Sequence, residues 1–178
     1  MPTLPESYQH IQNWATPGKL FHALDDRWGF TLDVCAEEWN AKCSKYYDKR
    51  MDGLAQSWGP EEHVWCNPPY RKPLPWLEKG WIAALELDST ATFLLPAVTE
   101  NIWFQDMAFL GDLYFIRGRL QFTPPAEYEG RVDACPFGSV IVRFTPELAL
   151  GDMEPECHLM TREGKISGPR RMVQGGLW

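Results

Sequence analysis

The stretch His63-Val64-Trp65-Cys66-Asn67-Pro68-Pro69-Tyr70 decides how the rest of the chain is interpreted. It opens with a short apolar run, which predicts a buried strand. A polar residue, two prolines and an aromatic residue follow directly, and they predict a rigid, concave lip at the end of that strand. A simpler account also fits these residues, since asparagine and proline commonly end a strand and turn the chain.

A lip of this kind suits a planar amine, such as the amino group of a nucleobase. That nitrogen is a poor nucleophile because its lone pair is delocalised into the ring. The side-chain oxygen of Asn67 and the main-chain carbonyl of Pro68 can accept its two N–H bonds and free the lone pair. Pro69 shapes the loop, and the fixed φ of the prolines aims the carbonyl in advance. Tyr70 offers a face for stacking, worth about 1–3 kcal/mol.

Apolar patterning elsewhere predicts an α/β open sheet, with strands and helices alternating before a three-strand ending. A helix is expected to start with Thr16 as N-cap and Pro17 as its first residue, with Leu20, Phe21 and Leu24 on one face. Further strands are expected at residues 30–35, 63–66, 91–95, 114–116, 120–122 and 139–144, and further helices at 37–42, 76–87 and 101–110.

Three chemically distinctive positions are expected at one edge of this sheet. Asn67 follows one strand, Asp33 lies near the end of another, and Pro96 comes directly after a third. Ligands of open α/β sheets bind beyond the carboxyl ends of the strands, so these positions predict a site there. Taken alone, Asp33 fits a capping carboxylate or an ion-pair partner equally well.

Composition excludes several classes of protein. The 178 residues predict one domain, and no apolar stretch approaches the roughly 20 residues that span a bilayer. The N-terminus lacks a charged-then-apolar signal pattern, so a soluble cytoplasmic protein without membrane contact is expected. The five cysteines form no C-x-x-C pair and the four histidines are scattered, which predicts no bound metal and no disulfide framework.

The formal net charge of −7 argues against strong nonspecific affinity for nucleic acid. The charge is nevertheless unevenly distributed. Arg71 and Lys72 adjoin the Asn-Pro-Pro-Tyr stretch, and Arg117 and Arg119 form a second pair. These four cations are candidate phosphate contacts, although each is also compatible with an ordinary solvated charge.

Several short motifs, in order, resemble the bacteriophage N6-adenine DNA methyltransferases of the Dam type. They are Trp14-Ala15-Thr16-Pro17, Leu32-Asp33-Val34-Cys35-Ala36 with Asn40-Ala41-Lys42-Cys43, Asp52-Gly53-Leu54 with Trp58, Trp65-Cys66-Asn67-Pro68-Pro69-Tyr70, Leu94-Leu95-Pro96, Trp103-Phe104, Gly118-Arg119-Leu120 with Phe122, and Phe137-Gly138-Ser139. The resemblance implies a Rossmann-like class I S-adenosylmethionine-dependent methyltransferase. It also implies S-adenosylmethionine as cofactor, adenine N6 in double-stranded DNA as acceptor, and the cytoplasm of a bacterial host as the place of action.

Carried over by position, the resemblance makes Asn67, Pro68, Pro69 and Tyr70 the catalytic motif. Its implied cofactor-binding residues are Trp14, Thr16, Pro17, Asp33, Cys35 and Asp52. The carboxylate of Asp33 is expected to hold the methionine ammonium or a ribose hydroxyl, and the start of the first helix is expected to face the methionine carboxylate. In isolation, Thr16-Pro17 also fits a plain helix cap, and Asp52-Gly53 a common turn.

Two features depart from the usual methyltransferase pattern. Cys35-Ala36-Glu37-Glu38 stands where a glycine-rich turn normally follows the first strand, so the cofactor contacts need not follow the standard plan. Only 34 positions separate Asp33 from Asn67, which predicts a sheet trimmed on that side.

The expected organisation is an N-terminal arm at residues 1–13, a methyltransferase domain at 14–146, and a C-terminal extension at 147–178 with a basic tail. The long excursion at residues 123–136 is expected to recognise or clamp DNA. Two alternatives stay open: methylation of another planar amine, in an RNA base or a protein glutamine, and a phage protein that binds cofactor or a host factor without turnover.

Overall fold

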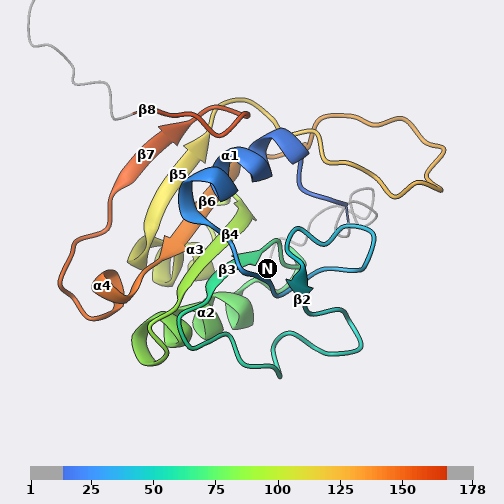
Figure 1. Cartoon of the computed structure of the whole chain (residues 1–178). Helices are drawn as coiled ribbons and strands as arrows, with labels where there is room; N and C mark the ends of the chain where they lie inside the picture. Colours follow the sequence, from blue (N-terminus) through green and yellow to red (C-terminus); the bar gives the residue numbers. More distant parts are fainter. Residues whose placement is uncertain (1–13, 168–178) are drawn as a thin grey trace, which may run out of the picture.

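An eight-stranded mixed sheet forms the centre of the protein, and helices cover both of its faces (Figure 1). The structure is a computed structural model that describes residues 14–167. The arm expected at residues 1–13, and Arg170 and Arg171 of the expected basic tail, lie outside the described residues.

The elements follow one another along the chain as α1 (Gly18–Trp28), β1 (Leu32–Asp33), β2 (Lys45–Tyr46), β3 (His63–Cys66), α2 (Leu74–Glu86), β4 (Thr90–Pro96), α3 (Ile102–Asp106), the 3₁₀ helix η2 (Ala108–Leu110), β5 (Asp112–Ile116), β6 (Ser139–Phe144), α4 (Pro146–Ala149), β7 (Cys157–Met160) and β8 (Ile166–Ser167). The strands lie in the order β2-β1-β3-β4-β6-β5-β7-β8.

Strands β2, β1, β3 and β4 are parallel, and β6 runs antiparallel between β4 and β5. The carboxyl ends of β1, β3, β4, β5 and β7 therefore share one edge of the sheet, here called the carboxyl edge. The order reverses at β1, which has β2 on one side and β3 on the other. That reversal is the topological switch point at which doubly wound sheets bind ligands. The predicted Rossmann-like α/β class is confirmed.

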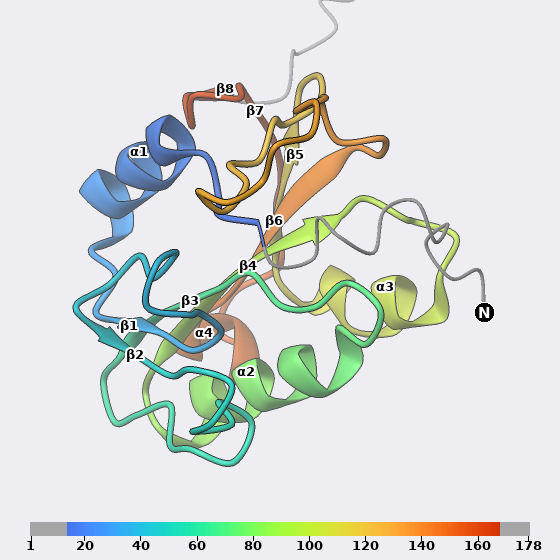
Figure 2. The same cartoon turned by 90° about the vertical axis from the view of Figure 1, so that its right-hand side faces the viewer.

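Buried apolar side chains form two separate cores. Figure 2 shows α1 on one face of the sheet and α2 and α3 on the other. On one face, α1 buries Leu20, Phe21 and Leu24, the three predicted positions, in the core that contains Trp65 of β3. On the other face, α2 packs against β4, so close that a Cβ at Gly80 would meet the ring of Phe93. Because both faces are covered, β4 is apolar and almost wholly buried, as is typical of central parallel strands.

The helix expected at residues 37–42 is wrong, because this segment forms turns. Asp33 accepts hydrogen bonds from the main-chain N–H groups of Cys35 (3.2 Å) and Lys42 (3.0 Å), which folds the segment back over the end of β1. The Asn40 side chain also accepts from the N–H of Glu37 at 2.7 Å. These side-chain bonds compete with helical main-chain pairing.

The strand expected at residues 120–122 is also wrong. Leu120 and Phe122 are buried, but the segment forms no ladder: the Cys135 N–H donates to the Leu120 carbonyl, and Thr123 forms an isolated bridge with Ala15. The place beside β5 is taken instead by β7. The sheet thus continues past residue 146, the boundary expected for the domain.

The remaining predicted helices and strands are present, but some of their caps or bounds differ from the prediction. Pro17, not Thr16, is the N-cap of α1, and the hydroxyl of Thr16 is buried without a hydrogen-bond partner among the described residues. The first strand is shorter than residues 30–35, and the helix at 101–110 divides into α3 and η2. Between β1 and β3 the described chain forms only the two-residue β2 and no helix, so this side of the sheet is short, as the spacing predicted.

Candidate active site

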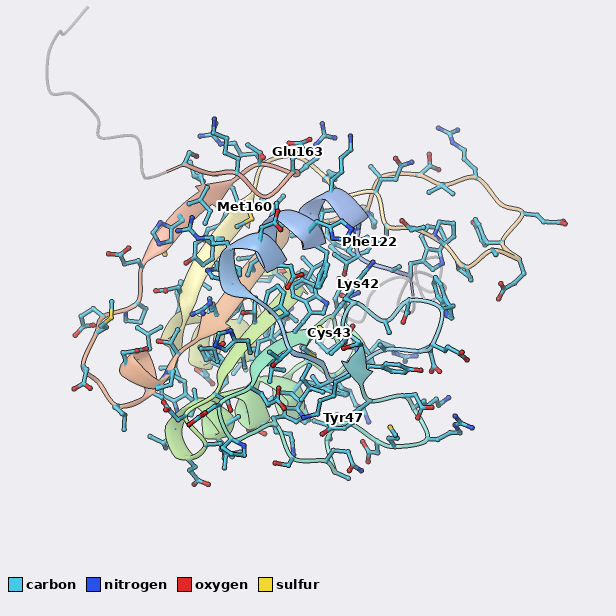
Figure 3. The ribbon with its side chains drawn as sticks, viewed as in Figure 1. Lys42, Cys43, Tyr47, Phe122, Met160 and Glu163 are labelled. Carbon is cyan, nitrogen blue, oxygen red and sulfur yellow. The ribbon has the colours of Figure 1, made fainter. Side chains whose placement is uncertain are left out.

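A cleft of about 320 Å³ lies at the topological switch point, beyond the carboxyl ends of β1 and β3. Its walls come from the segment after β1, the segment after β2, the start of the Asn-Pro-Pro-Tyr stretch, and Trp14 and Trp76. Figure 3 labels Tyr47, which lines this cleft and directly follows β2.

Asn67 is half-buried and is one of the residues that line this cleft. Its Nδ2 donates to the main-chain carbonyl of Trp14 at 3.4 Å, and its Oδ1 accepts from the hydroxyl of Tyr70 at 2.8 Å. A carbonyl can only accept, so the Trp14 contact fixes which end of the amide is nitrogen. The amide is therefore held between two partners, and its oxygen keeps a second lone pair for another donor.

Tyr70 is buried, and its ring meets Phe137 and Phe122 edge-on, with ring centroids 5.6 and 6.4 Å away. Burial raises the pKa of its phenol well above the ordinary value, which keeps the hydroxyl protonated as a donor to Asn67. In this arrangement Tyr70 holds the Asn67 amide, and its ring is largely occupied by aromatic neighbours. The stacking role expected from the sequence stays a prediction.

The residues implied as cofactor contacts divide into two groups. Trp14, Cys35 and Asp52 line the cleft, together with Asn67 and Pro69. Thr16, Pro17 and Asp33 are not among the lining residues, nor are Pro68 and Tyr70 of the motif that is expected to be catalytic. Burial raises the pKa of the Cys35 thiol to about 12, so Cys35 contributes a neutral, apolar surface rather than a thiolate.

Asp33 has a structural position. It is buried, and its two oxygens accept from the main-chain N–H groups of Cys35 and Lys42. Burial raises the pKa of its carboxyl to about 6, although these two N–H groups act in the opposite direction. The Asp33 carboxylate thus holds the segment after β1, which forms part of the cleft wall. This is the capping role that was one of the alternatives for Asp33 in the sequence analysis.

The cleft wall carries three carboxylates, of which the sequence analysis singled out only Asp52. Glu37, Asp48 and Asp52 line it beside Lys49, and Asp48 also forms an ion pair with Arg50 at 2.9 Å. Carboxylates accept hydrogen bonds from hydroxyl and ammonium groups, so this wall suits a ligand with ribose hydroxyls or a positive charge.

Asn40, Tyr47 and Trp76 also line the cleft without having been predicted. Tyr47 donates from its hydroxyl to the carbonyl of Ser57 at 2.9 Å, and Trp76 stacks on Trp58 with centroids 6.1 Å apart. The signal that could have found Tyr47 is its place directly after β2, whose carboxyl end lies at the carboxyl edge.

At Gly53 the segment after β2 comes very close to the main chain at the end of β1. Gly53 is buried in the cleft wall, and its carbonyl accepts from the indole N–H of Trp58 at 2.7 Å. A Cβ at this position would overlap the carbonyl oxygen of Val34 and lie 3.3 Å from the ring of Trp76. The segment after β2 therefore needs a glycine here to pack against the end of β1.

The four predicted cations all lie at the carboxyl edge. Arg71 and Lys72 are exposed and directly follow Tyr70. Arg117 follows the end of β5, and Arg119 donates to the carbonyl of Cys135 at 3.3 Å. The turn after β7 adds Arg162 beside Gly118, and its neighbour Glu163 is labelled in Figure 3.

Two further observations concern the described residues 14–167. They contain no group of three or more His, Cys, Asp or Glu side chains arranged to hold a metal ion. No helix among them has the length and apolar character needed to cross a membrane.

Comparison with known proteins identifies the family. The model of "DNA N-6-adenine-methyltransferase (Dam)" matches residues 5–159. A DNA N-6-adenine-methyltransferase of Haemophilus phage HP1 is 27% identical over 161 residues, which cover 86% of this chain and 91% of the relative. One of Escherichia phage T1 is 36% identical over 94 residues, which cover 52% of this chain but only 39% of the relative. The chain thus belongs to the DNA N-6-adenine-methyltransferase (Dam) family and has its Rossmann-like methyltransferase fold.

Proposed function

We propose that this protein transfers a methyl group from S-adenosylmethionine to N6 of adenine in double-stranded DNA, in the cytoplasm of a bacterial host. The observation that carries the proposal is the Asn67 amide, held by Trp14 and Tyr70 at the rim of a cleft at the switch point of the sheet. Family membership supports the choice of acceptor.

The residues of the cleft fit S-adenosylmethionine. A volume of about 320 Å³ falls in the range of small-molecule sites, roughly 300–1,000 Å³. Glu37, Asp48 and Asp52 are suited to its ribose hydroxyls and positive charge, and the rings of Trp14 and Trp76 to its apolar surfaces. When bound, S-adenosylmethionine supplies an electrophilic methyl group on a sulfonium sulfur.

Asn67 acts on the acceptor. The second lone pair of its Oδ1 accepts one N–H of the adenine amino group, and the Pro68 carbonyl accepts the other. With S-adenosylmethionine bound, the amino nitrogen would take its methyl group directly, as the bond between methyl and sulfur breaks and leaves a neutral thioether. The surplus proton on the nitrogen would leave to solvent, so the chain needs no covalent intermediate. The adenine must leave the duplex first, because its amino group is otherwise paired and out of reach.

The test is a methyl-transfer assay with S-adenosylmethionine and three acceptors: unmethylated duplex DNA, single-stranded RNA and a glutamine-containing protein. We expect N6-methyladenine in the DNA, identified by mass after digestion to nucleosides. Methyl groups only in RNA or protein would support the planar-amine alternative. Cofactor binding without transfer to any acceptor would support a binding protein.

The exposed cations at the carboxyl edge are proposed phosphate contacts. Replacing Arg117 and Arg119 together, or Arg71 and Lys72 together, by alanine is expected to weaken DNA binding. Each lost phosphate contact should also lower the slope of log K against log salt by about 0.9. Fluorescence anisotropy with a duplex oligonucleotide at several salt concentrations measures both quantities.

A matched control is Arg27→Ala. Arg27 is exposed in the last turn of α1, at the opposite end of this helix from Trp14 and the cleft. Its salt slope should equal that of the wild type. If all three variants keep the wild-type slope, these cations do not contact DNA.

A further inference from the structure

The segment at residues 123–136, here called the 123–136 loop, is tied directly to the chain that precedes α1. Thr123 and Ala15 exchange two main-chain hydrogen bonds, of 2.8 and 3.0 Å. Residue 15 directly follows Trp14, whose carbonyl orients the Asn67 amide. The start of the loop is therefore joined by main-chain pairing to Ala15, the neighbour of the residue whose carbonyl contacts the Asn67 side chain.

A second contact joins the body of the loop to the same residue. The ring of Tyr128 meets the indole of Trp14 edge-on, with centroids 4.9 Å apart and an interplanar angle of 66°. Trp14 is only 4% exposed, so this contact lies against a buried side chain. The Tyr128 N–H donates to the Pro125 carbonyl at 3.0 Å and its hydroxyl to the Arg131 carbonyl at 3.3 Å, which orders the loop around the ring.

The other partner of Asn67 also contacts the ends of this loop. Tyr70, which donates to Asn67 Oδ1, packs its ring against Phe122 and Phe137. These two residues lie just before and just after the loop (Figure 3 labels Phe122). Both hydrogen-bond partners of the catalytic amide therefore rest on the loop or its flanks.

We propose that Tyr128 is a positioning residue for methyl transfer: its ring fixes Trp14, and the Trp14 carbonyl then fixes the amide of Asn67. This inference rests on the proposed function, since it concerns the same reaction. It gives the 123–136 loop a task besides the DNA contact expected from the sequence. A clamp would act on DNA affinity, whereas a positioning residue acts on the rate of the chemical step.

The Asn67–Trp14 hydrogen bond is sensitive to small movements. At 3.4 Å it is already long for an N–H···O bond, so a shift of a few tenths of an ångström would break it. Misplacing a reacting group by about 1 Å can cost roughly 100-fold in rate. Loss of the Tyr128 ring is therefore expected to lower the single-turnover methylation rate about tenfold.

The experiment compares Tyr128→Ala, Tyr128→Phe and Gln121→Ala with the wild type. Tyr128→Phe keeps the ring and removes the hydroxyl that donates to the Arg131 carbonyl. Gln121→Ala removes a different anchor of the same loop, the 2.9 Å bond from its Nε2 to the Val132 carbonyl, without touching Trp14. We expect the tenfold loss in single-turnover rate only for Tyr128→Ala, with the Kd for duplex DNA unchanged in all three.

A second measurement does not depend on activity. The side-chain amide of Asn67 gives an NMR signal pair in the free protein, assigned by its absence in an Asn67→Ala sample. In Tyr128→Ala this pair is expected to move toward the position of a free amide, and in Tyr128→Phe to stay in place.

The possible results are distinguishable. An inactive wild type would refute the proposed function rather than this inference. An active wild type with an unchanged rate in Tyr128→Ala would overturn the inference. So would a loss confined to DNA affinity, which indicates a clamp, and so would equal losses in Tyr128→Ala and Gln121→Ala, which indicate general loosening of the loop.

Discussion

Asn67→Ala is expected to lower the methylation rate by a factor of about 10²–10³, the cost of removing one preorganised hydrogen-bonding group from a reacting centre. The residue is half-buried, and within residues 14–167 its side-chain amide bonds to Trp14 and Tyr70. Its loss should leave the fold nearly unchanged. Single-turnover kinetics with duplex DNA measure the rate, and thermal unfolding measures the stability.

Asn67→Asp is the matched control for this prediction. A carboxylate keeps an acceptor for the adenine amino group and for the Tyr70 hydroxyl, but it cannot donate to the Trp14 carbonyl. Its rate should lie between those of the wild type and Asn67→Ala. If Asn67→Ala methylates DNA at close to the wild-type rate, the amide takes no part in the reaction and the proposed mechanism fails.

The place of the Asn-Pro-Pro-Tyr stretch in the fold could be predicted from sequence because its signals are local. An apolar run, a polar residue and two prolines are adjacent in the chain, and together they specify a strand that ends in a rigid turn. The structure has β3 at His63–Cys66, the predicted bounds, and Asn67 at the rim of the cleft. What the sequence could not show is that the Tyr70 ring would be buried among Phe122 and Phe137, which are distant in the chain.

The contacts of Asp33, by contrast, depend on residues that the local sequence does not specify. Its place at the end of β1 was predicted correctly, but the sequence left open whether its carboxylate faces a ligand or caps the main chain. That direction depends on the following segment, which folds back so that the N–H groups of Cys35 and Lys42 reach the carboxylate. The carboxylates that do line the cleft, at Glu37, Asp48 and Asp52, come from turns whose path is set by tertiary contacts.

Strands β7 and β8 could not be predicted from the sequence for a related reason. β7 contributes only four residues, Cys157–Met160, and its first residue is exposed. Its strand character comes from pairing with β5, more than 40 positions earlier in the chain. Leu120 and Phe122 have the alternating pattern of a strand but find no neighbouring strand. Residues 157–160 form a strand and residues 120–122 do not, because only the former have a neighbouring strand with which to pair.

Gly53→Ala is the second substitution with a large expected effect. Its Cβ would overlap the carbonyl oxygen of Val34, and the rigid main chain of β1 cannot move aside as a flexible side chain would. The segment after β2 must therefore shift, and it carries Asp48 and Asp52 of the cleft wall with it. Overpacking of this kind costs about 1–3 kcal/mol of unfolding free energy. We also expect at least about tenfold weaker binding of S-adenosylmethionine, equivalent to roughly 1.4 kcal/mol.

Urea unfolding gives the first quantity, and isothermal titration with S-adenosylmethionine gives the second. Gly18→Ala is the matched control, because Gly18 is exposed at the start of α1 and a Cβ there would have only the His22 ring at 4.0 Å. It should bind S-adenosylmethionine as the wild type does. The decisive comparison is between the loss of stability and the loss of affinity for S-adenosylmethionine in Gly53→Ala. If this variant is less stable but binds S-adenosylmethionine as tightly as the wild type, the methyl donor does not bind in the cleft at the switch point. The proposed roles of Glu37, Asp48 and Asp52 would then be wrong as well.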